Sequence, residues 1–315
     1  MCPVLTLFFA TDVHGSDVCW RKLVSAGRFY KAQVVILGGD TTGKEVVPLI
    51  RQPDGTILSD FMHMKTTLKG EKEIEAHERR IIDTGYYPYH TTQDEMAELS
   101  RDHEKANAVF RALMLERTRD WVKIADSNLK GSGIRFIVAP GNDDSPEIDP
   151  ILDASEVVER AEGKVLEIDG HEMINSGWTN PTPWDTPREC SEEELAKKIE
   201  RMALQVKDPK TSMFQLHAPP YQSGIDEAPL LDENLRPIKG GTVRGPAGSR
   251  AVAEAVRKYQ PLVGLHGHIH ESRGATKIGR TLCINPGSMY SEGILQGVVI
   301  RLDKDGIKSH VFTSG

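Results

Sequence analysis

Five short apolar segments, each followed within two residues by Gly, Asp or His, constrain this chain more than any other feature. They are mostly apolar and only four to seven residues long, which is typical of strands buried on both faces of a sheet. Ligands gather where the strands of such sheets end. The segments are residues 4–10, 34–37, 134–139, 213–216 and 262–265.

Helix-capping residues stand between these strands. Ser16, Ser191 and Ser249 each precede a stretch with helical apolar spacing, and Glu194 completes a capping box after the second of them. Gly27 is a plausible end for the first helix. Strands that alternate with helices predict an α/β fold.

The C-terminal segment departs from this alternation. Residues 297–302 and 307–312 predict two strands joined by an Asp-Gly turn at 303–306. We therefore expect a mixed sheet with antiparallel strands near the C-terminal end.

Residues 44–131 interrupt the core pattern and predict an insertion, a hairpin plus helices, within a single domain spanning 1–315. In chain order we expect a hairpin turning at 53–55, a charged helix over 71–82, an aromatic loop at 86–89, and a long helix that begins at Thr92 and runs toward Asn128. We expect the long helix to pack on the core of its own domain, with a homodimer interface or a substrate cap as the alternatives.

Charge and cysteine usage narrow the partners and the compartment. The chain has 39 Lys and Arg against 46 Asp and Glu, a net charge of −7, which argues against extended nucleic acid and anionic membranes as partners. Its four cysteines are widely spaced and predict reduced thiols in a cytoplasmic protein. No apolar run is long enough to suggest a membrane segment.

The polar residues at the strand ends form a candidate metal-ligand set. Asp12 and His14 are separated by one residue, as are His268 and His270, and in extended backbone that spacing places both side chains on one face. Each motif alone is weak, but carboxylate, amide and imidazole groups recur at five strand ends, and divalent metals prefer these ligands. The set comprises Asp12, His14, Asp40, Asn142, His217, His268 and His270.

Two other catalytic classes fit less well. Residues 38–45 nearly spell a phosphate-binding P-loop, but Glu45 replaces the hydroxyl residue that would bind Mg²⁺, and Asp40 would place a carboxylate inside the phosphate cradle. A serine hydrolase is disfavoured because the chain has no Gly-x-Ser-x-Gly motif.

The ordered motifs at 12–14, 39–40, 141–142, 217 and 267–270 resemble those of the calcineurin-like metallophosphoesterase superfamily. Segments 217–220 and 284–288 also look like later segments of that family, and the resemblance covers about residues 5–300 outside the insertion. It implies an α/β fold in which a two-sheet β-sandwich is flanked by helices, a four-layer α/β/β/α arrangement with a largely helical insertion.

The resemblance also implies a dinuclear metal site that hydrolyses a small phosphorylated substrate by attack of a metal-bridging hydroxide. Mn²⁺ is the expected metal, with Fe²⁺/Fe³⁺ or Zn²⁺ as alternatives. The implied ligands are Asp12, His14 and His270 for one ion, Asn142, His217 and His268 for the other, and Asp40 as the bridge. Asp40, Asn142, Asp143 and His217 are the implied catalytic residues. The ions and their ligands leave about one positive charge, which suits an anionic phosphate.

Asp143 departs from the family pattern, in which Gly-Asn is usually followed by His. A carboxylate is a poorer proton donor at pH 7 and adds negative charge beside the substrate, so we expect phosphodiesters to be preferred to dianionic monoesters. The alternative is that Asp143 is a solvated loop carboxylate without a catalytic part. A phosphomonoesterase or nuclease of the same fold, or a non-catalytic metal-binding scaffold that recruits partners, are the alternative functions.

Three further features receive supporting roles. We expect Asp144 to hydrogen-bond residues around the site, and His266 either to support the ligands in the same way or to be structural. The loop 178–184 is either an aromatic platform for a substrate or a packed surface loop.

Overall fold

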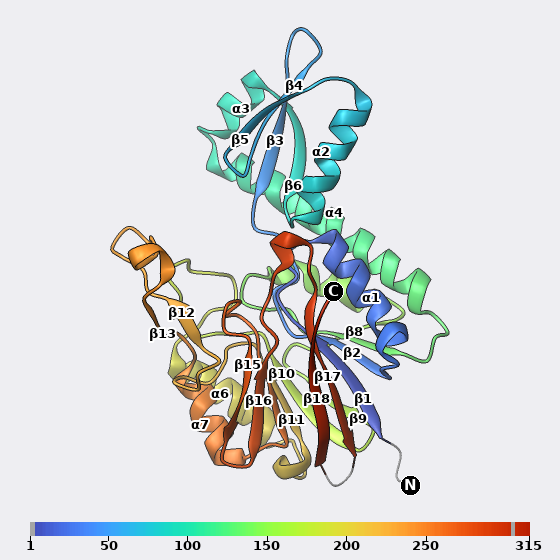
Figure 1. Ribbon diagram of the computed structural model, residues 1–315, viewed down its shortest axis with the longest axis vertical. Helices are drawn as coiled ribbons and strands as arrows, with labels where there is room; N and C mark the ends of the chain where they lie inside the picture. Colours follow the sequence, from blue (N-terminus) through green and yellow to red (C-terminus); the bar gives the residue numbers. More distant parts are fainter. Residues whose placement is uncertain (1–3, 304–305) are drawn as a thin grey trace.

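The computed structural model describes residues 4–303 and 306–315. Within them the strands form two six-stranded sheets and two smaller sheets, and helices pack on both large sheets, which confirms the expected mixed α/β fold (Figure 1). Cys2, and Lys304 and Asp305 in the expected C-terminal turn, lie outside the described residues.

The first large sheet contains, in spatial order, β18 (Gly306–Ser314), β17 (Gln296–Asp303), β1 (Leu5–Ala10), β2 (Val34–Leu37), β7 (Arg135–Val138) and β8 (Val158–Arg160). The four strands from β1 to β8 run parallel, whereas β17 pairs antiparallel with both β1 and β18. The predicted C-terminal antiparallel strands are thus confirmed.

The second large sheet contains, in spatial order, β15 (Gly274–Ile278), β16 (Thr281–Asn285), β14 (Val263–Leu265), β11 (Met213–Leu216), β10 (His171–Ser176) and β9 (Val165–Ile168). Its four inner strands are parallel and its two edge strands are antiparallel. A two-stranded ribbon, β12 (Glu227–Pro229) and β13 (Arg244–Pro246), leaves it between β11 and β14.

An apolar cluster lies between the two large sheets. Alternate residues of the first sheet, such as Phe9 and Ile36, pack against Met213 and Val263 of the second. Every residue of β1, β2 and β11 is buried, because one side chain in two faces this cluster and the next faces a helix layer. This is why the strands appear in the sequence as short, mostly apolar runs.

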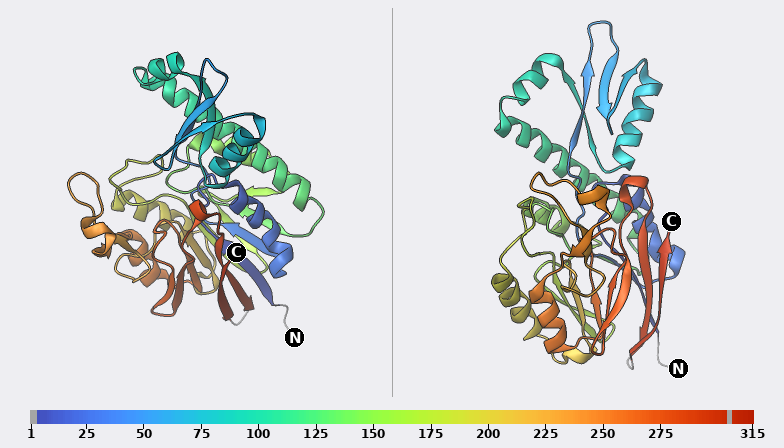
Figure 2. Two further views of the ribbon diagram at one scale, coloured as in Figure 1. Left: turned by 45° about the horizontal axis from the view of Figure 1, so that its top comes forward. Right: turned by 60° about the vertical axis from the view of Figure 1, so that its left-hand side comes forward.

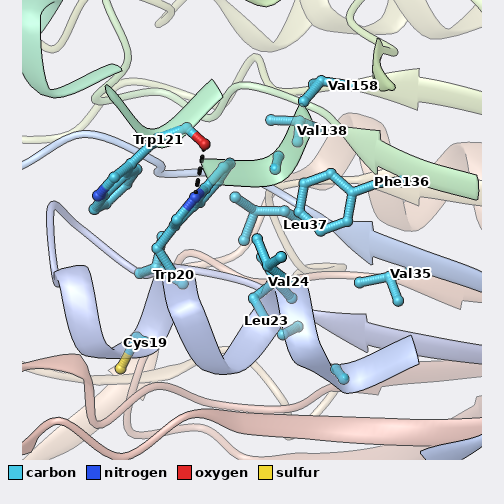
Figure 3. Packing of buried hydrophobic residues seen from close by; sticks show 14 of the residues in the cluster. Cys19, Trp20, Leu23, Val24, Val35, Leu37, Trp121, Phe136, Val138 and Val158 are labelled. Carbon is cyan, nitrogen blue, oxygen red and sulfur yellow. Dashed lines mark hydrogen bonds between the residues drawn. The ribbon is translucent and has the colours of Figure 1, made fainter. Parts of the chain in front are cut away.

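Helices α1 (Asp17–Tyr30) and α4 (His103–Leu129) cover the outer face of the first sheet, next to the short helix α5 (Asp149–Asp153). The rings of Trp20 and Trp121 stack at 4.7 Å, and Trp20 Nε1 donates to the Trp121 carbonyl (Figure 3). The expected end of α1 at Gly27 is wrong. Gly27 lies inside the helix, where a side chain would collide with Ile134, so glycine serves close packing there. The helix ends at Tyr30 and is followed by Lys31 in the left-handed conformation.

Helices α6 (Glu192–Ala203) and α7 (Arg250–Tyr259) cover the outer face of the second sheet. The expected caps are confirmed, since the side chains of Ser191 and Ser249 accept hydrogen bonds from Glu194 N and Val252 N. Short 3₁₀ helices lie at Pro146–Ile148, Pro209–Thr211, Ile238–Gly241 and Tyr290–Glu292.

The insertion carries a four-stranded sheet in addition to its helices, and it stands at one end of the molecule beyond the large sheets (Figure 2). The sheet has the order β5 (Met64–Leu68), β4 (Ile57–Phe61), β3 (Val46–Arg51) and β6 (Tyr87–Thr92). Helix α2 (Glu71–Asp83) packs on one face of it through Ile81. The hairpin and the charged helix correspond to those predicted.

Two expectations for the insertion are wrong. The expected loop at 86–89 instead belongs largely to β6, and this edge strand tolerates Pro88, which has no N–H to donate. The expected long helix is divided into α3 (Gln93–Leu99) and α4, because the Asp102 side chain accepts from Lys105 N and caps a new helix. The Thr92 cap is confirmed, and the second half of α4 packs on the domain core.

Among the described residues, every helix is too short or too polar to cross a lipid bilayer. Cys19, Cys190 and Cys283 are free thiols.

Candidate metal centre

The loops after the parallel strands carry the candidate site in strained backbone conformations. Asp12, His14, Asp40 and His268 have positive φ angles of 54°, 38°, 48° and 68°. Residues with a side chain rarely adopt this region, at a cost of about 1 kcal/mol or more each, and such residues cluster at functional sites.

Backbone hydrogen bonds join the loops that follow β1 and β2. Asp12 N donates to the Gly39 carbonyl and His14 N donates to the Asp40 carbonyl, both at 3.0 Å. Across the sandwich, His268 N donates to both carboxylate oxygens of Asp12 at 3.1–3.2 Å. Side chains more than 250 positions apart in the sequence are therefore fixed at one place.

Asp12, His14 and His270 form the first candidate ligand group, with ligand atoms within 4.8 Å of one another. The Nε2 atoms of His14 and His270 lie 3.0 Å apart, and Asp12 Oδ1 lies 3.4 Å from that of His270. Two imidazole nitrogens this close repel each other unless a proton or a cation lies between their lone pairs. The arrangement therefore suits a shared cation.

Asp40, His217 and His268 form the second candidate group, again within 4.8 Å. His217 Nδ1 lies 2.9 Å from the Gly38 carbonyl, which only accepts, so Nδ1 must carry the hydrogen. Its Nε2 faces Asp40 Oδ2 at 3.3 Å and has no hydrogen-bond partner among the residues that the structure describes. Such a backbone contact fixes the ring orientation of a metal-binding histidine.

Asn142 reaches the same place because the residues on both sides of it touch Asp40. The Thr186 hydroxyl donates to Glu189, so it accepts from Asn142 Nδ2 at 2.8 Å, and this fixes the amide orientation. Asn142 Oδ1 is left buried without a partner in the described part of the chain. An unpaired carbonyl oxygen beside carboxylates is suited to a cation.

Glycines make the close approach of these loops possible. A side-chain carbon on Gly39 would lie 2.0 Å from His217 Nδ1, and one on Gly141 would lie 2.2 Å from Asp40 Oδ1. The Gly-Asp and Gly-Asn motifs thus have a packing reason as well as a chemical one.

Burial and neighbouring charges set the ionisation of the group. Burial would raise the pKa of Asp12, yet hydrogen bonding to His270 and the surrounding imidazoles hold it well below its usual range. Burial lowers the pKa of His268 to about 3. Burial would also lower the pKa of His217, but Asp40 raises it to about 10. A cation at this site would therefore displace a proton from His217.

Asp143 is an ion-paired side chain of the site and not a solvated loop carboxylate. Its side chain is 13% exposed, its Oδ2 lies 2.6 Å from Lys44 Nζ and 3.7 Å from His14 Nδ1, and its backbone N donates to Asp40. Burial, followed by the charge of Asp40, raises the pKa of Asp143 to about 6, which still leaves the carboxyl mostly ionised at pH 7.

Asp144 and His266 are buried residues that hold the loops together. The Asp144 carboxylate accepts hydrogen bonds from Thr41 N, Thr42 N and Gly141 N at 2.8–3.1 Å. His266 Nδ1 contacts the Leu216 carbonyl at 2.8 Å.

Sequence reasoning missed other residues of the site. Tyr290 lies with its ring 4.8 Å from the His14 ring. Ser288 belongs to the segment 284–288 but was given no role, and its Oγ donates to the Asp12 carbonyl. Thr186 had no motif around it. Lys44 was considered only as part of the P-loop motif. The structure does not support a P-loop, because Lys44 leads into a strand and not a helix.

The contact with Asn142 comes from Thr186, two residues beyond the expected aromatic loop 178–184. Trp184 is 63% exposed, and Lys198 lies over the Trp178 ring at 3.9 Å.

The seven ligand candidates fit divalent cations. Their donor atoms are carboxylate and amide oxygens and imidazole nitrogens, which suit Mn²⁺, Fe²⁺ and Zn²⁺. Asn142 Oδ1 and His217 Nε2, two buried ligand atoms without hydrogen-bond partners within the described ranges, support the same conclusion.

Comparisons with known proteins show likeness in fold. No protein family model matches the chain. The uncharacterized protein MJ1162 of Methanocaldococcus jannaschii is 30% identical over 155 residues, which cover 49% of this chain and 64% of that protein. The matched part of the chain thus spans less than two thirds of this curated relative.

Two solved structures align over 99% of both chains, one with a TM-score of 0.58 and 14% identity. The other, TT1561 of Thermus thermophilus, has a TM-score of 0.53 and 13% identity. A solved archaeal phosphodiesterase aligns over 99% of this chain and 100% of its own, with 12% identity and a TM-score of 0.39.

Proposed function

We propose that this protein is a metal-dependent phosphoesterase that hydrolyses a small phosphodiester at a site for two divalent cations. The observation that carries the proposal is the adjacency of two ligand groups, Asp12, His14 and His270, and Asp40, His217 and His268, each with its ligand atoms within 4.8 Å. Asn142 adds a buried carbonyl oxygen. Intact ligands at all seven positions favour an enzyme over a scaffold without activity.

In this proposal the chain's residues hold and orient the reacting groups. When bound, two divalent cations lower the pKa of water and stabilise the charge that develops on phosphoryl oxygens. Asp12 and Asp40 would supply the negative charge that retains the cations, and Asp40, whose Oδ2 lies 3.5 Å from His14 Nε2 and 3.3 Å from His217 Nε2, would contribute to holding both. His217, with its ring fixed by the Gly38 carbonyl, and Asn142, fixed by Thr186, orient ligand atoms toward the same point.

The preference for a diester rests on Asp143. This carboxylate is only 13% exposed beside the ligands, and an ionised Asp143 repels the second negative charge of a monoester. A phosphomonoesterase is the second candidate, and Lys44 is the observation that favours it, because its ammonium offsets the charge of Asp143.

The test combines metal analysis with turnover. We expect protein from metal-replete medium to bind two equivalents of metal, Mn²⁺ foremost, and His217→Ala to lose metal and turnover while remaining folded. His310→Ala is the control, since His310 is an exposed residue of β18. Well under one equivalent of metal in the wild-type protein would contradict the proposal.

A matched pair of aryl phosphate esters decides between the two candidates. With Mn²⁺ present, faster cleavage of the diester supports the phosphodiesterase, and faster cleavage of the monoester supports the phosphomonoesterase.

A further inference from the structure

Lys44 joins the core to the insertion and places its ammonium beside the candidate metal centre. Its Nζ lies 2.6 Å from Asp143 Oδ2, and the same oxygen lies 3.7 Å from His14 Nδ1. The ammonium is thus separated from a candidate ligand ring by a single carboxylate oxygen.

The backbone before Lys44 is held by both the core and the insertion. Thr42 N donates to Asp144, and Gly43 N donates to the Tyr87 hydroxyl at 2.8 Å. Gly43 is packed so closely that a side-chain carbon there would lie 2.2 Å from the Gly85 carbonyl oxygen. The position of Lys44 over the site is therefore set before any ligand binds.

Lys44 also remains accessible to a ligand. Its side chain is 48% exposed, whereas that of Asp143 is 13% exposed. An ammonium has three N–H donors, and the contact with Asp143 uses one of them. The remaining donors can reach a second acceptor on the open side.

We propose that Lys44 is a substrate-binding residue that donates a hydrogen bond from Nζ to a non-bridging phosphate oxygen, and that Asp143 is the positioning residue that holds this ammonium over the site. The inference rests on the proposed function and deepens it, because it gives the first residue of the insertion a direct part in binding the phosphate group. Charge-assisted hydrogen bonds of this kind are the strong ones.

The competing explanation is that Lys44 only neutralises Asp143. The two explanations differ for a double variant. If neutralisation is the whole role, Lys44→Met harms phosphate binding by exposing the Asp143 charge, and adding Asp143→Asn restores affinity. If Lys44 binds phosphate, the double variant stays weak because the donor is still missing.

The experiment uses the full chain loaded with Mn²⁺ and measures the affinity for inorganic phosphate by calorimetry, together with KM and kcat for the better aryl ester. We expect Lys44→Met to weaken phosphate binding about 10- to 100-fold, with a matching rise in KM, and the double variant to remain within about threefold of Lys44→Met. Lys44→Arg, which keeps the charge, should recover part of the affinity.

Lys105→Met is the matched control, because Lys105 pairs with Glu98 in the same insertion and should leave phosphate affinity unchanged. Wild-type affinity in the double variant, or a change below twofold in Lys44→Met, would overturn the inference. The metal content of each variant distinguishes the inference about Lys44 from the proposed function. A loss of phosphate affinity at full metal content concerns Lys44 alone. A wild-type protein that binds no metal contradicts the proposed function itself.

Discussion

The buried carboxylate of Asp144 offers a sharp test of how the loops around the site are held. Asp144 is fully buried, and its two oxygens accept hydrogen bonds from Thr41 N, Thr42 N and Gly141 N, and from the Thr42 hydroxyl. In Asp144→Asn the shape is kept, but one oxygen becomes an NH₂ donor. Whichever way the amide turns, it faces at least one backbone N–H that had an acceptor.

The expected cost follows from these contacts. An unsatisfied buried N–H costs about 1–3 kcal/mol, and the bonds that remain lose the strength contributed by a charged acceptor. We therefore expect Asp144→Asn to lower the free energy of unfolding by about 2–4 kcal/mol, a large share of the about 5–15 kcal/mol typical of a domain.

Urea denaturation in the presence of a chelator measures this cost without a contribution from bound metal. Asp120→Asn is the control, since the Asp120 side chain is 55% exposed and its loss should change stability by no more than about 0.5 kcal/mol. A cost below about 1 kcal/mol for Asp144→Asn would refute the reasoning, because it would mean that the donors find other acceptors.

Burial raises the pKa of Glu162, whose carboxylate accepts a hydrogen bond from Gly177 N. The folded protein therefore binds the carboxyl proton of Glu162 more tightly than the unfolded chain does, and it loses stability as pH rises through the folded pKa. Glu162→Gln should therefore raise Tm at pH 8 and leave it nearly unchanged at acid pH; an equal effect at both would contradict this assignment. Gly141→Ala places a carbon 2.2 Å from Asp40 Oδ1, and the clash should lower the free energy of unfolding by about 1–3 kcal/mol. It should also weaken Mn²⁺ binding at least tenfold, as measured by titration calorimetry. Unaltered Mn²⁺ affinity would show that the loop shifts without moving Asp40.

The strand ends were predictable because both of their features are local. A strand buried on both faces is mostly apolar, and the chain after it must leave the sheet, so segments such as 34–37 and their following Gly-Asp motif are visible in the sequence. The caps of α6 and α7 were predictable for a similar reason, since a cap involves residues only three apart.

The errors occurred where a long-range contact decides the local structure. Gly27 is a glycine because Ile134 packs against it and not because the helix ends there, and residues 87–92 form a strand because β3 pairs with them. The undivided long helix is a different kind of error, because its signal was present in the sequence. Asp102 is a good capping residue, and its side chain caps α4 and so divides the expected long helix.

The amino-acid sequence by itself determined the α/β class and the chemical types of the seven ligand candidates. The apolar pattern of each strand and the chemistry of each side chain are local properties that do not depend on distant contacts. Only the tertiary structure decided that Asp143 is paired with Lys44, and that Thr186 and Tyr290 border the same site. An ion pair between residues 44 and 143 has no sequence pattern, since its distance is set by how the loops after β2 and β7 pack on each other.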